Sequence, residues 1–211
     1  MRRGLVLCLV ALLMASAGVA SAETYLGLRF GGYGNYVHSG GTFWDSGFFT
    51  YREFAVGFGD EIQGEVAIGW NTVNQTYDDD DGGDFRGNQE DKWSAMGFGV
   101  AGFYPIMEGS SYRVDAGARF QYMTGSNTWT WEPTDQENTQ SIGGWAIGPL
   151  VRGAWQLGSL PVTFGPEAYL KYSSLTYKEE REVGGETTFE EEQDISGFSI
   201  DYSFRLDFYF D

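Results

Sequence analysis

The last stretch of the chain, residues 195–210, alternates between two kinds of side chain. It reads ISGFSIDYSFRLDFYF, and from Phe198 onward every second residue is Phe, Ile, Tyr or Leu, whereas those between are mostly polar or charged. Successive side chains of a strand point to opposite faces, so the pattern predicts a β-strand with one apolar and one charged face. At ~3.3 Å per residue it spans about 50 Å. A transmembrane β-strand needs ~9–11 residues of such alternation, so the stretch predicts a strand of a membrane barrel.

The N-terminus predicts a secretory signal peptide over residues 1–22. Two arginines precede an apolar run at residues 5–13, and the small residues Ala20-Ser21-Ala22 follow it. A transmembrane helix anchor is the alternative, but the run is shorter than the ~20 residues that span a bilayer. A lipoprotein signal at Cys8 is disfavoured because most of the apolar run follows this cysteine. We expect a mature barrel of residues 23–211.

The composition of the chain restricts the partners and cofactors that we expect. The chain has 13 basic and 30 acidic residues and a formal net charge of −17, which argues against nucleic acid as a partner. Its single cysteine, Cys8, leaves with the predicted signal, so thiolate sites are not expected, and we expect no metal and no cofactor. Aromatic residues make up 17% of the chain and there are 31 glycines. This composition fits a barrel with an aromatic outside and a crowded inside.

Similar alternation recurs in seven earlier stretches. They are residues 24–32, 48–59, 62–73, 92–104, 112–124, 142–156 and 162–177. The connections between the stretches alternate long and short, beginning and ending with a long one. Outer-membrane barrels combine short periplasmic turns with long outward loops and an even strand number. The rhythm predicts an all-β fold, an eight-stranded antiparallel up-and-down transmembrane β-barrel in a bacterial outer membrane.

Aromatic residues mark the height of the predicted membrane belt. Tyr112 and Tyr122 lie ten residues apart on one apolar face, which at ~3.3 Å per residue and a tilt of ~40° projects to about 25 Å, the height of the lipid-facing band. The predicted girdle comprises Trp70, Tyr112, Tyr122, Trp145, Trp155 and Tyr172. A soluble lipocalin-like barrel would exchange the two faces, but eight strands leave little room inside for so many large side chains. Pro149 and Pro166 fall within predicted strands, where we expect bulges or strand ends.

The chain resembles the small eight-stranded outer-membrane barrels, namely the OmpA transmembrane domain, the OmpX/Ail group and the OmpW group. The resemblance rests on the alternation, the succession of long and short connections, and the aromatic end Phe208-Tyr209-Phe210. The resemblance is architectural, covers the mature chain and selects no single group. Members commonly end in an aromatic residue that the barrel-assembly machinery reads, whereas here Asp211 follows. The resemblance implies outer-membrane lipid and this machinery as partners. We also expect a monomer.

The other faces of the strands supply a balanced set of charges for the barrel interior. The basic residues are Arg29, Arg113, Arg119, Arg152, Lys171 and Arg205, and the acidic ones are Glu53, Glu65, Asp115, Glu167, Asp201 and Asp207. Charges in a narrow interior are costly unless paired, so we expect an interlocked ion network. It could line a charged pore, but eight strands leave a lumen just filled by side chains, which favours a plug. Small inward residues such as Gly99, Gly117 and Gly148 would leave space for arginine head groups or water.

The predicted loops contain two further groups of candidate site residues. Acidic runs at residues 78–84 and 178–194 hold most of the net charge, and the first lacks the spacing of an EF-hand calcium loop, so we expect solvated, mobile loops. His38, Ser39 and Asp45 supply the residue types of a hydrolase triad, but a glycine-rich loop does not hold triad geometry, so no enzyme is expected.

These observations predict a surface protein whose loops serve adhesion or envelope integrity, with a host or extracellular ligand, on a mostly plugged barrel. A narrow passive channel for small or apolar solutes, as the resemblance to the OmpW group implies, is the alternative. Conductance across a planar bilayer separates the two functions.

Overall fold

The computed structural model describes residues 24–34, 36–38, 41–43, 52–59, 61–78, 88–131 and 135–210. Their strands are β1 (Thr24–Gly34), β2 (Tyr36–His38), β3 (Gly41–Phe43), β4 (Arg52–Phe58), β5 (Gln63–Asp78), β6 (Asn88–Glu108), β7 (Tyr112–Trp131), β8 (Gln136–Gln156), β9 (Val162–Val183) and β10 (Glu186–Phe210). Within these ranges, no helix is long and apolar enough to cross a membrane. The predicted signal peptide at 1–22, the start of the second predicted strand at 48–51, and residues 79–84 of the first acidic run lie outside the described residues.

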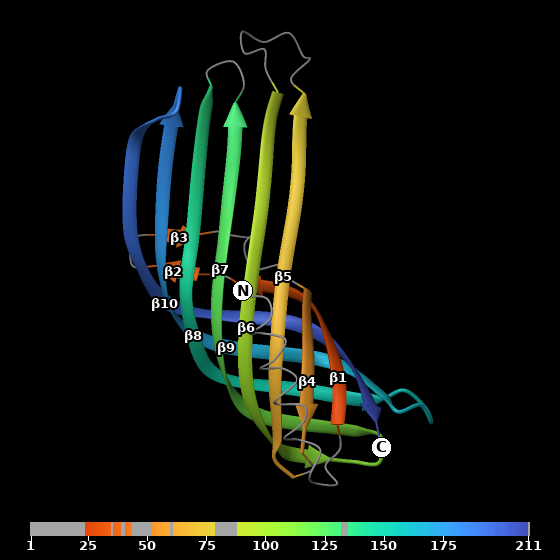
Figure 1. Ribbon diagram of the computed structural model, residues 1–211. Coiled ribbons are helices and arrows are strands. Elements are labelled where there is room, and N and C mark those ends of the chain that lie inside the picture. Colours follow the sequence, from red (N-terminus) through yellow and green to blue (C-terminus); the bar gives the residue numbers. More distant parts are fainter. Residues whose placement is uncertain are drawn as a thin grey trace, which may run out of the picture.

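Eight strands close a barrel in the order β1-β10-β9-β8-β7-β6-β5-β4, and every neighbouring pair is antiparallel. The predicted fold class is therefore confirmed. Apart from β1 with β10 at the closure, barrel neighbours are successive barrel strands along the chain, with the β2–β3 hairpin inserted between β1 and β4 (Figure 1). β2 and β3 pair in a separate hairpin, and β2 lies against β10.

The register of the barrel sets the tilt of its strands. One inward-facing row runs round the ring through Gly197, Ser173, Ala146, Gln121, Gly99, Ala67, Ala55, Gly27 and Asp207. The row starts and ends on β10, ten residues apart (207 − 197). With ~3.3 Å per residue and ~4.8 Å between strands, this offset gives a tilt of about 40°, as in transmembrane barrels. Mostly small side chains in the row leave room for the long charged ones beside it.

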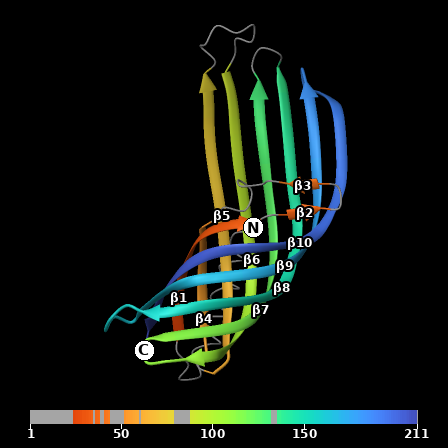
Figure 2. The ribbon, with the colours of Figure 1, turned by 180° about the vertical axis from the view of Figure 1, so that it is seen from behind.

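Six strands continue far beyond the ends of β1 and β4. β10 pairs with β1 only as far as Asp201, yet it pairs with β9 up to Glu186. β5 pairs with β4 as far as Trp70 and with β6 as far as Asp78. Figures 1 and 2 show β5 to β10 rising as a tall sheet above the short β1 and β4. We call this extension the outer sheet; it comprises residues 71–78, 88–95, 124–131, 136–144, 174–183 and 186–197.

The outer sheet corrects the prediction of a long loop at residues 125–141 and of a mobile acidic loop at residues 178–194. β7 and β8 stay paired from Tyr112 to Trp131, and β9 and β10 reach the turn at Gly184 and Gly185. Side-chain hydrogen bonds, such as that between Thr128 and Thr139 (3.3 Å), cross between these strands. The sequence pattern missed them because polar residues occupy both faces, so no apolar–polar period remains.

The expected bulges at Pro149 and Pro166 are absent from the register. The β8–β9 pairing keeps the same offset on both sides of Pro149, and Pro166 pairs with Phe204 in an unshifted stretch of β9 and β10. The barrel tolerates each lost backbone donor because the flanking pairs hold the register. A shift occurs instead between Pro105 and Met107, within residues that we had predicted to be a turn.

Candidate functional site

The face that points away from the barrel axis is apolar. Phe198 and Phe204 on β10 are 65% and 63% exposed, and Val151 on β8 is 46% exposed. Soluble monomers rarely expose a continuous apolar patch of such extent. The arrangement is that of a barrel whose outside contacts hydrocarbon and whose inside is polar.

Aromatic side chains form two rows across the apolar face. In the lower row Tyr112 pairs with Trp155, whose ring centroid lies 6.2 Å from that of Phe164. The upper row contains Tyr122, Trp145, Tyr172 and Phe198. In the upper row the centroids from Trp145 to Tyr172 and from Tyr172 to Phe198 are 6.0 and 5.2 Å apart. Trp70 of β5 is also exposed, so all six predicted girdle residues lie on the outward face.

The twelve charged residues that we predicted to face the lumen point inward, and each makes an ion pair with another of the twelve. We call them the ion network. Ten are buried: Arg29, Glu53, Glu65, Asp115, Arg119, Arg152, Glu167, Lys171, Arg205 and Asp207. Arg113 and Asp201 are partly exposed; they pair with Asp115 and Lys171, each at 2.5 Å. Every barrel strand except β6 contributes.

Glu65 is one centre of the ion network. Its carboxylate contacts Arg29, lies 3.0 Å from Arg205 and 3.5 Å from Arg152, and accepts a hydrogen bond of 2.8 Å from the Tyr25 hydroxyl. Three arginines from three strands thus share one buried anion. Ion pairs in such an interior are stable only when their remaining hydrogen-bonding groups are also satisfied, and the Tyr25 hydroxyl supplies one such partner.

Glu167 is a second centre. It lies 3.0 Å from Arg29, 3.4 Å from Arg119 and 3.3 Å from Arg205. Arg29 and Arg205 each contact both Glu65 and Glu167, so the two centres share two arginines. Glu53 extends the network because it contacts both Arg29 and Arg119. The chain of contacts crosses the lumen from β1 and β4 to β7 and β9.

Below these centres, aromatic side chains fill the lumen. The Arg152 guanidinium lies 3.7 Å from the ring centroid of Phe103 and donates a hydrogen bond of 2.9 Å to the Tyr25 hydroxyl. Phe103 also packs with Leu150 and Tyr169. Our prediction of the site omitted Tyr25 and Phe103. Their position in the two-residue period could have identified both as inward-facing.

Glycines make room for the network at some positions only. A Cβ at Gly99 would lie 3.1 Å from Nε of Arg119, and one at Gly27 would lie 2.7 Å from the Asp207 carboxylate. The expected space for an arginine head is thus found at Gly99. At Gly117 and Gly148 a Cβ would instead meet the backbone of a neighbouring strand.

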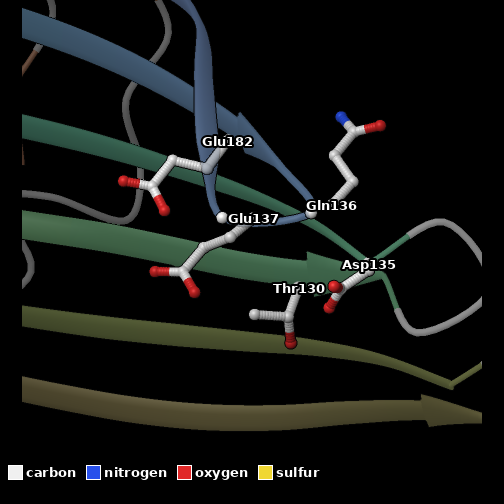
Figure 3. Close-up of a pocket in the computed structure, with 7 residues that line it drawn as sticks. Thr130, Asp135, Gln136, Glu137 and Glu182 are labelled. Atoms are coloured by element: carbon white, nitrogen blue, oxygen red, sulfur yellow. The ribbon is translucent and has the colours of Figure 1, made fainter.

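The tip of the outer sheet carries an acidic pocket of about 410 Å³ (Figure 3). Glu137 and Glu182, which pair directly across β8 and β9, line it together with Asp135. In Figure 3 the Gln136 side chain points away from those of Glu137 and Thr130. Across the described part of the chain, no group of three or more His, Cys, Asp or Glu side chains is arranged to hold a metal ion.

The acidic segment of β9 and β10 places like charges opposite each other. Glu180 pairs with Glu190 and Glu179 with Glu191, an arrangement that is unfavourable between strands. Nearby, Lys178 lies 2.6 Å from Glu192, and this hydrogen-bonded contact raises the pKa of the Lys178 ammonium.

One residue of the predicted hydrolase trio lies within the described ranges. His38 lies in β2 and pairs with Gly41, whereas Ser39 and Asp45 lie outside the described residues.

Comparison with known proteins supports the fold. The sequence matches no protein-family model and no curated protein. A major outer membrane protein from Thermus thermophilus has a similar structure, with a TM-score of 0.56 and 13% identity over 90% of this chain and 100% of that chain. Neisserial surface protein A (TM-score 0.41, 10% identity, 88% and 96% covered) and Ail, the attachment invasion locus protein of Yersinia pestis (0.40, 7%, 88% and 99%), also match. The chain has the fold of the small eight-stranded outer-membrane barrels, which the sequence resemblance had predicted.

Proposed function

We propose that this protein is a monomeric outer-membrane barrel that holds the outer sheet above the membrane as a rigid recognition surface, without a channel or an enzymatic site. The apolar belt and its two aromatic rows support lipid as the surrounding medium and the barrel-assembly machinery as the insertion partner. Adhesion, or attachment to other envelope components, is the role that such a surface serves.

The observation that carries the proposal is the pairing of β9 with β10 as far as the tip, with one register shift between Thr187 and Phe189. From Phe198 in the upper aromatic row to Glu186 at the tip there are twelve residues (198 − 186), which at ~3.3 Å each and a tilt of ~40° extend about 30 Å beyond the membrane. Paired strands are ordered before a partner arrives, so binding loses less conformational entropy than it would with mobile loops.

A shortened hairpin tests this proposal. Removing residues 179–183 and 186–191 places Gly184 and Gly185 between Lys178 and Glu192, which already pair. The barrel and its ion network stay intact. Cells producing the shortened protein should be retained about tenfold less on wells coated with laminin or with envelope polysaccharide. Equal retention of both strains, at equal surface levels, would reject the recognition role.

Conductance tests the closed lumen. The buried ion network argues against a continuous water path at the level of Glu65 and Glu167. The wild-type protein should give no discrete openings in a planar bilayer. Openings that change in the Arg119→Ala or Glu167→Ala variant would establish the narrow channel instead.

A further inference from the structure

The two faces of the outer sheet differ in chemistry. The face continuous with the barrel interior carries planar amide, indole and charged side chains on three adjacent strands: Asn127 and Trp129 on β7, Asn138 and Gln140 on β8, and Glu179 and Arg181 on β9. We call these six residues the amide patch. The opposite face of the same strands carries hydroxyl groups, such as those of Thr128 and Thr139.

The register brings the amide patch together. Asn127 pairs with Gln140, which pairs with Glu179 in the same row. In the adjacent row Trp129 pairs with Asn138, which pairs with Arg181. Directly opposed residues have Cβ atoms ~4.5–5.5 Å apart, so the two rows form one continuous surface.

Two amides in the patch can form further hydrogen bonds with a ligand. Asn127 is only 7% exposed, and its Oδ1 atom has no hydrogen-bond donor within the described residues. The Oδ1 atom of Asn138 accepts hydrogen bonds from Arg181 (2.9 Å) and Gln136 (3.3 Å), which orient this amide. Both of these hydrogen bonds go to the oxygen of the Asn138 amide, so its nitrogen can donate to a ligand. A buried polar group without a partner is unfavourable, so a ligand that donates a hydrogen bond to the Asn127 oxygen gains affinity.

The neighbouring charged groups already have partners. Arg181 donates to Asn138 and lies 5.8 Å from the ring centroid of Phe189, and Glu179 accepts a hydrogen bond of 3.0 Å from the Tyr177 hydroxyl. The groups that a ligand can bind are therefore the neutral acceptor of Asn127 and the neutral donor of Asn138. The half-buried indole of Trp129 lies beside both. This set suits a neutral ligand more than an ion.

We propose that the amide patch binds a saccharide. A sugar hydroxyl both donates and accepts, so adjacent hydroxyls can satisfy Asn127 and Asn138 together. The indole of Trp129 offers a flat apolar surface to the C–H face of a pyranose ring. This proposal names the ligand class of the recognition surface and rests on that surface being displayed outside the membrane. The saccharide comes either from the envelope of the cell itself or from an external glycan.

Saturation-transfer difference NMR on the full-length protein in detergent micelles tests the site. The probes are maltohexaose, chitotetraose and the lipid-free polysaccharide of the producing strain. At least one should bind, and binding of the strain's own polysaccharide alone identifies an envelope source. The Asn127→Ala and Asn138→Ala variants should bind about tenfold more weakly. The Thr128→Ala variant, altered at the next residue but on the opposite face, should bind like the wild type.

Several results would overturn the saccharide site. They are the absence of binding to all three probes, equal binding by the Asn127→Ala, Asn138→Ala and wild-type proteins, or equal loss in the Thr128→Ala control. Heat-modified migration in gels checks that each variant is a folded barrel. If all probes fail while the shortened hairpin still abolishes cell retention, the outer sheet recognises another class of partner. The failure of the saccharide proposal is then distinguished from a failure of the recognition role.

Discussion

The substitution Glu65→Gln should strongly destabilise the barrel, although it barely changes the shape of the side chain. Glu65 is 2% exposed and is the shared anion of Arg29, Arg152 and Arg205. The amide keeps an acceptor for the Tyr25 hydroxyl but removes the negative charge. Three guanidinium groups would then remain in the interior with one carboxylate fewer.

The size of the effect follows from the burial of the network. Removing one partner from a buried ion pair costs about 3–5 kcal/mol, because the remaining charge is left uncompensated. If the free energy of unfolding falls by about 2 kcal/mol per M of urea, the urea concentration at the midpoint of unfolding should decrease by about 2 M. Urea titration in phosphocholine vesicles, followed by tryptophan fluorescence and by heat-modified migration, measures this shift.

Two comparisons make the test specific. Glu190→Gln changes a carboxylate on the exposed tip that faces Glu180, so it should alter the free energy of unfolding by less than about 0.5 kcal/mol or raise it slightly. Combining Glu65→Gln with Arg205→Met should destabilise less than the sum of the single changes, by about 0.5–3 kcal/mol. A loss below about 0.5 kcal/mol for Glu65→Gln, or strict additivity with Arg205→Met, would refute a structural role for the network.

Three further predictions concern other parts of the molecule. The substitution Phe103→Leu keeps an apolar side chain beside Arg152 but removes the cation–π contact. The free energy of unfolding, measured by the same urea titration, should therefore fall by about 2 kcal/mol. An unchanged free energy would show that the contact does not stabilise the barrel. Val151→Arg, midway along the apolar face, should cost about 2–4 kcal/mol in vesicles, whereas Thr128→Arg in the outer sheet should cost much less; equal costs would contradict the assigned belt. Burial and the hydrogen bond to Glu179 raise the pKa of the Tyr177 phenol, and the bond to Glu192 raises the pKa of the Lys178 ammonium. Each raised pKa stabilises the folded state fully below the unfolded pKa of its group, which is about 10 for Tyr177 and about 10.4 for Lys178. This stabilisation is lost as pH rises through the folded pKa. The difference in tyrosinate absorbance between the wild-type and Tyr177→Phe proteins should therefore titrate above pH ~10, and titration at the ordinary value would refute this.

The barrel could be predicted from the sequence because lipid requires an apolar side chain at nearly every outward position. That requirement imposes a two-residue period on stretches such as residues 195–210, and the period identifies both the strands and their inward residues. Above the membrane no such requirement applies. Strands such as 124–131 carry polar residues on both faces, so they cannot be told from loops by periodicity.

The identity of the inward-facing charged residues could be predicted from the sequence, but the ion pairs between them could not. Inward orientation follows from the period alone, whereas the partners of Glu65 depend on how far each strand is shifted against the next. The offset of ten residues around the ring brings Arg29, Arg152 and Arg205 to the height of Glu65. No pattern within a single strand contains that offset.

The pairing of β1 with β10 has a consequence for how the barrel assembles. Every other joint of the ring links successive barrel strands, with only the β2–β3 hairpin inserted between β1 and β4, so strands can add sequentially with small losses of loop-closure entropy. The closing joint brings Thr24 beside Phe210, nearly the whole length of the chain away. Because formation of distant contacts limits folding rates, this last joint should set the speed of insertion, and it is the place where an assembly factor gains most by holding two strand edges together.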